Sequence, residues 1–257
     1  MRSASPPRAG SATGGKHMIY AARSVTGKRA NNEDSFFVPK GGEISLAIVA
    51  DGMGGHSAGN IASAIAVEAV ASELKKGGPG GPAALVMNAV NHANTAVFEY
   101  ASAHPECKGM GTTLVMALLF KTRFVAANVG DSRLYHYHAG KLRQVTVDHS
   151  YVAELVASGY ITREEAARHP RRNLITRAIG TRACERVDIF ECDWEENDAL
   201  LLCSDGLYSE LEDEDLVRVL KESETLDAAC ASLVELALAS GSRDNVSVVL
   251  VENGEVR

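Results

Sequence analysis

Four aspartates lie at the ends of four short apolar segments. Asp51, Asp131 and Asp205 each follow an apolar run, whereas Asp244 precedes one. A carboxylate at the tip of a buried strand is partly desolvated, which disfavours its charged form unless a partner compensates. Four such groups in one domain would repel one another unless a cation lay among them. Because the candidate ligands are all oxygen atoms, the pattern favours Mg²⁺ or Mn²⁺ over zinc.

The segment 51–56, Asp-Gly-Met-Gly-Gly-His, follows a predicted strand and precedes a predicted helix. Glycine lets the backbone turn tightly and brings carbonyl oxygens close to a ligand. A dinucleotide-binding turn needs Gly-x-Gly-x-x-Gly, but Ser57 stands at the third glycine position. Taken alone, this segment also fits an ordinary strand-to-helix turn.

The composition predicts one intracellular globular domain. With 257 residues, of which 46% are hydrophobic, the chain can build one sizeable core. Its five cysteines are odd in number and contain no Cys-x-x-Cys pair, which favours a reduced, cytoplasmic protein over a disulfide scaffold. No apolar run approaches the roughly 20 residues that span a bilayer, so we expect no membrane segment in this chain.

Charge is spread unevenly along the chain. The formal net charge is −7, yet the first 30 residues contain basic side chains and no acid. The remainder is therefore strongly acidic, which argues against nucleic-acid binding. Residues 1–16, rich in Ser, Pro and Gly, are predicted to be a disordered leader or an expression remnant, and residues 17–257 a single domain.

Strand blocks interleaved with helix pairs predict an α+β layered sandwich. Strands are expected at about 18–23, 34–38, 44–50, 112–120, 122–129, 133–138, 141–145, 186–193, 198–204 and 245–252. Helices are expected at about 58–75, 82–101, 213–221 and 225–240. The polar residues 149–180, with two short helical patterns, are a candidate flap.

The motifs around these aspartates, taken in order, resemble those of one family. They are Arg-Ala-Asn-Asn-Glu-Asp at 29–34, Asp-Gly at 51–52, Gly-Thr-Thr at 111–113, Gly-Asp-Ser-Arg at 130–133, Asp-His-Ser at 148–150, His-Pro at 169–170, Ser-Asp-Gly-Leu at 204–207 and Arg-Asp-Asn at 243–245. Over residues 18–252 the chain resembles the metal-dependent Ser/Thr protein phosphatases (the PPM, or type 2C, family) in their bacterial form. The resemblance implies a four-layer sandwich of two antiparallel β-sheets flanked by helix pairs, with a flap insert at about 149–180.

The resemblance also implies a metal centre of Mn²⁺ or Mg²⁺. Asp51 would bridge two ions, and the Gly52 carbonyl would bind one of them. Asp205 and Asp244 would hold the other ion, and Asp131 would bind a weaker third.

Other residues take their expected roles from the same resemblance. Arg29 would clamp the substrate phosphate through paired N–H donors. Glu33 and Asp34 would act close to the metal ions, directly or through ordered waters. His169 and Arg171, in the flap, are candidate substrate contacts, although His169 also fits a simple helix ending and Arg171 a solvated side chain.

The function implied is hydrolysis of phosphoserine and phosphothreonine in proteins by a metal-bridging water, opposing a bacterial-type Ser/Thr kinase. We expect phosphoprotein substrates and a monomer. Two alternatives are a phosphatase for small phosphomonoesters and a catalytically silent phospho-binding module. A cysteine-dependent phosphatase is excluded because no cysteine begins a Cys-x₅-Arg motif.

Two observations leave questions open. Met53 stands where many eukaryotic members have a histidine proposed as general acid, so the proton donor to the leaving group is not assigned. His136 and His138 alternate with tyrosines on a predicted strand, which favours a surface ladder over a metal site.

Overall fold

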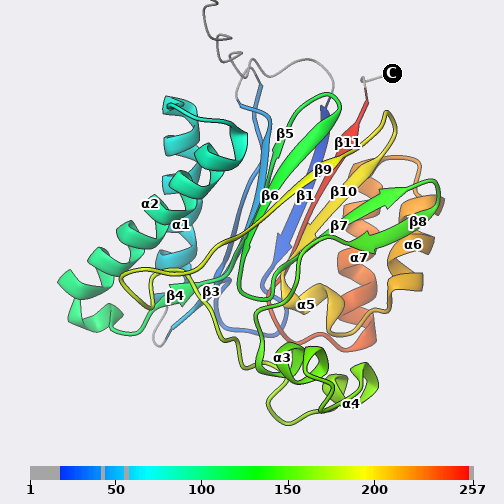
Figure 1. The fold of residues 1–257 in the computed structure, drawn as a ribbon. Coiled ribbons are helices and arrows are strands. Elements are labelled where there is room, and N and C mark those ends of the chain that lie inside the picture. The colour runs from blue at the N-terminus through cyan, green and yellow to red at the C-terminus, as the bar shows by residue number, and fades with distance from the viewer. Residues whose placement is uncertain (1–17, 42–43, 55–57, 255–257) are drawn as a thin grey trace, which may run out of the picture.

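Two antiparallel sheets stack face to face (Figure 1). The computed structural model describes residues 18–41, 44–54 and 58–254. The predicted leader at 1–16 lies outside these residues. The first sheet has the order β1 (Met18–Val25), β11 (Val246–Asn253), β10 (Ala199–Cys203), β7 (Arg133–His138) and β8 (Lys141–Gln144). The second has the order β2 (Asp34–Phe37), β3 (Leu46–Met53), β5 (Leu114–Leu119), β6 (Arg123–Val129) and β9 (Asp188–Asp193), and β4 (Gly111–Thr112) pairs with β3.

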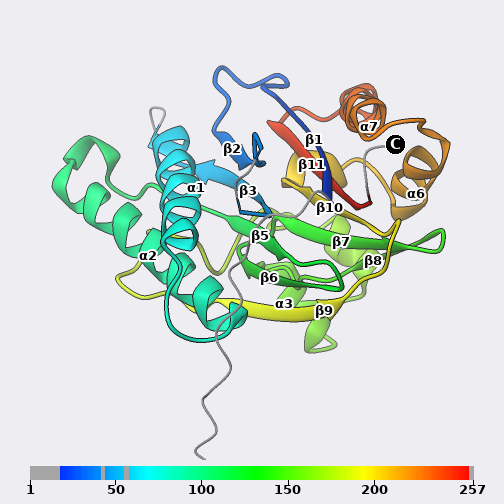
Figure 2. The same cartoon turned by 90° about the horizontal axis from the view of Figure 1, so that it is seen from above.

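A helix pair covers the outer face of each sheet (Figure 2). The long helices α1 (Ala58–Lys76) and α2 (Pro82–Ala103) pack on the second sheet. Helices α6 (Asp213–Glu222) and α7 (Leu226–Ser240) pack on the first. The predicted fold class, an α+β sandwich of two antiparallel sheets with flanking helices, is confirmed.

The central strands are apolar on both faces because each face meets another layer. In β3, Ala47 and Val49 face the space between the sheets, whereas Leu46 and Ile48 face α1 and α2. All four side chains are fully buried. Burial on both faces explains why these strands read as unbroken apolar runs and not as an alternating pattern.

Three features of the backbone differ from the sequence prediction. Strand β3 continues through Asp51 and ends at Met53, because Gly52 and Met53 pair with β4. The chain enters a one-turn helix, α5 (Asp205–Tyr208), directly after β10, and a 3₁₀ helix, η1, spans Pro105–Cys107. Helices of three or four residues are too short to produce a hydrophobic period.

Residues 149–180, hereafter the insert, lie between β8 and β9 at one end of the sandwich (Figure 1). The insert contains α3 (Tyr151–Ala157) and α4 (Arg163–Ala167). Ser150 caps α3, and Thr162 and Glu165 form a capping box on α4. Its role as a moving flap remains a prediction. No helix in the described part of the chain is long and apolar enough to cross a membrane.

Candidate active site

The structure brings the predicted aspartates together at one end of the sandwich. Asp34 begins β2 and pairs in register with Asp51 of β3. Asp205 follows β10, and Asp244 precedes the neighbouring strand β11. Asp131 follows β6 of the other sheet. Both sheets therefore contribute carboxylates to one centre, and each of these aspartates influences the ionisation of at least one other.

Burial and mutual repulsion raise the pKa of these acids. Desolvation is the main cause for Asp51, whose pKa lies well above its usual value, and repulsion from Asp34 follows. Desolvation also raises the pKa of Asp34 to about 6, although hydroxyl groups of Ser247 and Ser204 oppose this rise. The centre therefore holds negative charge only at a cost in free energy.

Burial and repulsion also raise the pKa values of Asp205 and Asp131. Burial, and then repulsion from Asp244, raises the pKa of Asp205 to about 6. Burial, and then repulsion from Asp205, raises the pKa of Asp131 to about 7. A divalent cation would offset these charges and favour the ionised carboxylates.

One oxygen atom in the centre is a buried acceptor without a donor. Ser204 Oγ donates to Asp34 Oδ2 at 2.8 Å and accepts from the Ser247 N–H at 3.0 Å. Asp34 Oδ1 is buried, and no described residue donates a hydrogen bond to it. An acceptor left in this way fits a cation or the water bound to one. Within the described residues, no group of three or more His, Cys, Asp or Glu side chains has a geometry that could hold a metal ion as it stands.

Gly52 lies where three chain segments cross. Its N–H donates to the Glu33 carbonyl at 3.1 Å. A Cβ at Gly52 would collide with the carbonyls of Gly59 and Glu33. A Cβ at Gly59 would in turn lie 2.9 Å from Cδ of Glu33. Glycine at both positions therefore lets the motif that contains Glu33, the end of β3 and the first turn of α1 pack against one another.

Asn245 holds the Arg29–Asp34 segment in place, a role that the sequence did not indicate. Its Oδ1 accepts from the Glu33 N–H at 2.8 Å. Its Nδ2 donates to the carbonyls of Thr26 at 2.9 Å and Asn31 at 3.0 Å. The side chain thus fixes a loop more than 200 positions away in the sequence, directly beside Asp244.

We expect Asn245→Ala to lower the free energy of unfolding by about 3 kcal/mol, because it leaves three backbone groups without their partner. The loss would be measured by urea unfolding, with Asn91→Ala, on the exposed face of α2, as the control. Equal stability of the two variants would contradict this role for Asn245.

A cavity of about 380 Å³ adjoins the acidic centre. Arg29 lines it and donates from Nη2 to Asp244 Oδ2 at 2.6 Å. Arg172 and Arg243 also line it, as do Asp205 and Asp244. The cavity therefore presents cationic donors beside the carboxylates, an arrangement suited to a phosphate group.

The two predicted insert residues lie beside this cavity and not on its lining. Arg171 lies over the Tyr151 ring at 5.7 Å and lines an adjacent groove of about 530 Å³. His169 Nδ1 accepts from the Arg171 N–H at 3.1 Å. Arg172, the next residue, lines both hollows. The sequence could not choose between adjacent arginines because the choice depends on how the 169–174 turn folds.

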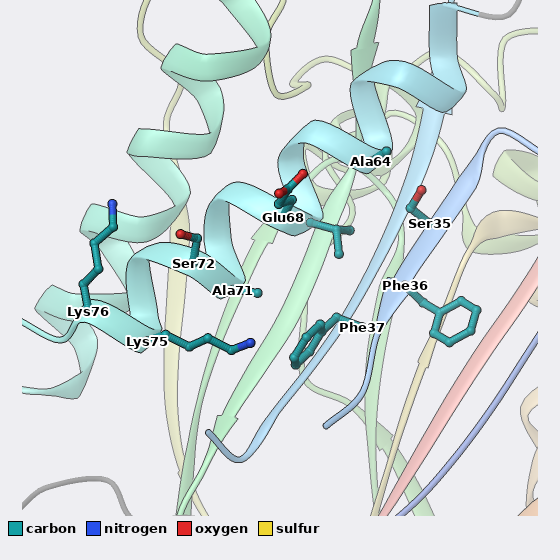
Figure 3. A pocket seen from close by; sticks show the side chains of 10 residues that line it. Ser35, Phe36, Phe37, Ala64, Glu68, Ala71, Ser72, Lys75 and Lys76 are labelled. Carbon is teal, nitrogen blue, oxygen red and sulfur yellow. The ribbon is translucent and has the colours of Figure 1, made fainter. Parts of the chain in front are cut away.

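A separate groove of about 720 Å³ lies between β2 and α1 (Figure 3). Phe37, with Lys75 5.5 Å from its ring centroid, lines one part of it. Glu68 and Ser72 of α1 line another part. None of the predicted metal ligands lines this groove, so it is distinct from the acidic centre.

Thr113 connects Asp51 to the turn that carries Asp131. Its Oγ1 accepts from the Asp51 N–H at 2.9 Å and lies 2.6 Å from Ser132 Oγ. The sequence marks this segment by its Gly-Thr-Thr motif at 111–113, but it does not indicate that Thr113 binds the Asp51 backbone.

The two-sheet sandwich and the aspartates gathered at one end of it define the class, an α+β fold with an acidic centre beside an arginine-lined cavity. A family model described as protein phosphatase 2C matches residues 23–237. The chain therefore belongs to the protein phosphatase 2C family, as the sequence motifs predict.

Individual relatives agree with this assignment. The serine/threonine phosphatase stp of Listeria monocytogenes is 38% identical over 234 residues, which cover 87% of this chain and 91% of the relative. The serine/threonine protein phosphatase PstP of Mycobacterium tuberculosis is 41% identical over 235 residues, covering 91% of this chain and 44% of PstP. The crystal structure of the PstP catalytic domain in complex with two manganese ions matches with a TM-score of 0.82 and 39% identity, over 92% of this chain and 98% of that domain.

Proposed function

We propose that this protein is a metal-dependent phosphatase that hydrolyses phosphoserine and phosphothreonine in proteins. The observation that carries the proposal is the cluster of partly buried, mutually repelling aspartates beside a cavity lined by arginines. The relatives named as serine/threonine phosphatases, and the PstP catalytic domain with its two manganese ions, support it.

Asp51, Asp205 and Asp244 would hold two divalent cations, with the Gly52 carbonyl as a further ligand. When bound, two such cations lower the pKa of water to give a nucleophile at neutral pH and offset charge on the phosphoryl oxygens. Glu33 and Asp34 would hold ordered waters around them. The lone Asp34 Oδ1 supports this role. We further propose that Asp131 binds a weaker third cation.

Arg29 would orient the substrate phosphate at the mouth of the cavity. Its guanidinium already lies against Asp244, so a phosphate bound there would sit next to the cation ligands. His169 and Arg171, together with Arg172, would contact the protein part of the substrate from the insert. Met53 has no proton to donate, so the proton for the leaving group must come from solvent or another group.

The remaining parts of the proposal concern the cellular setting. We propose a single catalytic domain over residues 17–257 that acts as a monomer in the cytoplasm and opposes a Ser/Thr kinase. The five cysteines are all free thiols, which is compatible with a reducing compartment.

The proposal predicts that a phosphothreonine peptide is hydrolysed with Mn²⁺ or Mg²⁺ present and that excess chelator abolishes turnover. Phosphate release would be measured with the peptide and with p-nitrophenyl phosphate, each with and without metal. A higher kcat/KM for the peptide supports a protein substrate, and the reverse order would favour the small-ester alternative. Full activity in chelator would contradict the proposed function, and a silent phospho-binding module would show no turnover with metal.

A further inference from the structure

His149 lies at the joint between the insert and the turn that carries Asp131. Its backbone N–H donates to the Gly130 carbonyl at 2.9 Å. In return, the Gly130 N–H donates to Nδ1 of the His149 ring at 3.1 Å. The His149 side chain is 4% exposed. Two reciprocal hydrogen bonds therefore fix Gly130, and Asp131 is the next residue.

The Gly130 contact indicates which nitrogen of the His149 ring carries the proton. The Gly130 N–H needs an acceptor, so Nδ1 is unprotonated, and a neutral ring then carries its proton on Nε2. Nε2 lies 3.1 Å from Asp188 Oδ2, which can accept that proton's hydrogen bond. Arg177 Nη1 lies 3.0 Å from Nε2 and also donates to Asp188 Oδ1 at 2.9 Å, so Arg177 and His149 share Asp188 as a partner. Burial lowers the pKa of His149, in agreement with a neutral ring.

His149 also joins the two stems of the insert. Its carbonyl accepts from the Thr176 N–H at 2.8 Å. Two residues further along, the Tyr151 N–H donates to the Leu174 carbonyl at 2.8 Å. The stem that enters α3 and the stem that returns to β9 are thus paired at the residue that binds Gly130.

On its other side, the Gly130 turn is packed against the centre. Gly130 has φ of +105°, and a Cβ there would lie 2.7 Å from the methyl group of Thr113. Thr113 is the residue that accepts from the Asp51 N–H. A shift of the Gly130 turn would therefore press on the segment that supports Asp51 as well as moving Asp131.

We propose that His149, in its Nε2–H form, is a positioning residue that couples the conformation of the insert to the placement of the Asp131 carboxylate. The role of Asp131 as a cation ligand rests on the proposed function, whereas the joint itself does not. Closing or loosening of the insert over a phosphoprotein would then alter the cation affinity of the Asp131 site, and cation binding would in turn order the insert.

The test compares His149→Ala with His149→Asn, because the asparagine amide oxygen can replace Nδ1 as the acceptor for the Gly130 N–H. His138→Ala is the matched control. Like His149, His138 has one ring nitrogen on an aspartate, with His138 Nδ1 2.6 Å from Asp198 Oδ1, but His138 ends β7, whereas the Asp131 turn precedes this strand. Hydrogen exchange of the full chain would report the Tyr151 and Thr176 amides. Calorimetric titration with Mn²⁺ alone would report the weakest site.

We expect His149→Ala to speed exchange of the two stem amides about tenfold and to weaken the weakest Mn²⁺ site by about tenfold or more. His149→Asn should restore most of both properties, and His138→Ala should change neither. Nitrogen-15 spectra of the wild-type ring should show a proton on Nε2 and none on Nδ1. Unchanged exchange in folded His149→Ala, no rescue by His149→Asn, or a proton on Nδ1 would each overturn the proposal.

The spectra and the asparagine variant still decide the matter if His149→Ala does not fold. The exchange and nitrogen-15 measurements need no turnover. A protein without phosphatase activity would therefore refute the proposed function and leave the joint to be judged on its own results.

Discussion

Asp205→Asn is expected to reduce metal-dependent phosphatase activity by at least about 10³-fold, because loss of a cation ligand removes several kcal/mol of transition-state stabilisation. The amide is close in shape to the carboxyl but carries no charge. The Arg29–Asp244 contact does not involve Asp205, so the proposed phosphate clamp should stay in place. Turnover of p-nitrophenyl phosphate at saturating Mn²⁺ measures the effect.

The control is Asp193→Asn, on an exposed residue of β9 that pairs with Arg123 at the start of β6, far from the turn that carries Asp131. This control should retain full activity. Stability separates a lost ligand from a damaged fold. Without metal at neutral pH, Asp205→Asn should unfold at the same temperature as the wild type or higher, because it removes a buried charge that Asp244 repels. Near-normal turnover by Asp205→Asn would contradict the assignment of Asp205 as a ligand.

The metal-free protein is expected to lose stability as the pH rises from about 4 to about 7. The pKa of Asp34 and of Asp205 is raised to about 6 in the folded protein, and that of Asp131 to about 7. Groups with a raised pKa bind more protons in the folded than in the unfolded chain within this window. Their contribution to stability is therefore complete below about pH 4 and disappears as the pH passes through the folded-state values.

The expected loss is on the order of a few kcal/mol, since one pKa unit corresponds to about 1.4 kcal/mol. Urea unfolding at pH 5 and pH 7.5 in chelator would measure it, and Mn²⁺ at pH 7.5 should restore the stability by binding the folded state alone. Asp188 and Asp198, whose pKa values are lowered by their histidine and other partners, act in the opposite direction. Because Asp205→Asn removes one of the groups with a raised pKa, this variant should show a smaller dependence of stability on pH than the wild type. Equal stability at both pH values in chelator would contradict the electrostatic account of the centre.

Local patterns were enough to predict an α+β layered sandwich, whereas the arrangement in two sheets and four layers came from the family resemblance. The strand through Ala47 and Val49 is apolar on both faces because it is covered on both, and such runs are easily recognised. Helix α5 was missed because a single turn leaves no periodic signal, although it places Asp205 in the first turn of a helix and not at a strand end.

The positions of the aspartates followed from the ends of the predicted strands, but the residues that hold them did not. Asn245 contacts Glu33 across 212 positions, and His149 contacts Gly130 through a ring nitrogen that could have faced elsewhere. Both lie inside motifs that the sequence singled out. Their partners depend on which strands become neighbours, and no local pattern contains that information.

His136 and His138 illustrate the same limit at the far end of the sandwich. The alternating pattern favoured a surface ladder, yet His136 is mostly buried, and both rings bind the buried Asp198, at 2.8 Å and 2.6 Å. Asp198 precedes β10. In the sheet β10 is the neighbour of β7, but along the sequence β8, the insert and β9 lie between them. The sequence of β7 alone could not identify this shared carboxylate.

The position of β11 has a consequence for the order in which the molecule matures. This strand lies between β1 and β10, and the Asp244-Asn245 pair that completes the centre directly precedes it. During synthesis, the first strand of the sheet must wait for a strand made more than 200 residues later. A nascent chain halted before Asp244 carries Arg29, Asp51 and Asp205 but cannot close the sheet that aligns them. Catalytic competence should therefore arise only after β11 leaves the ribosome, which keeps a chain that still lacks this strand from acting on phosphorylated proteins.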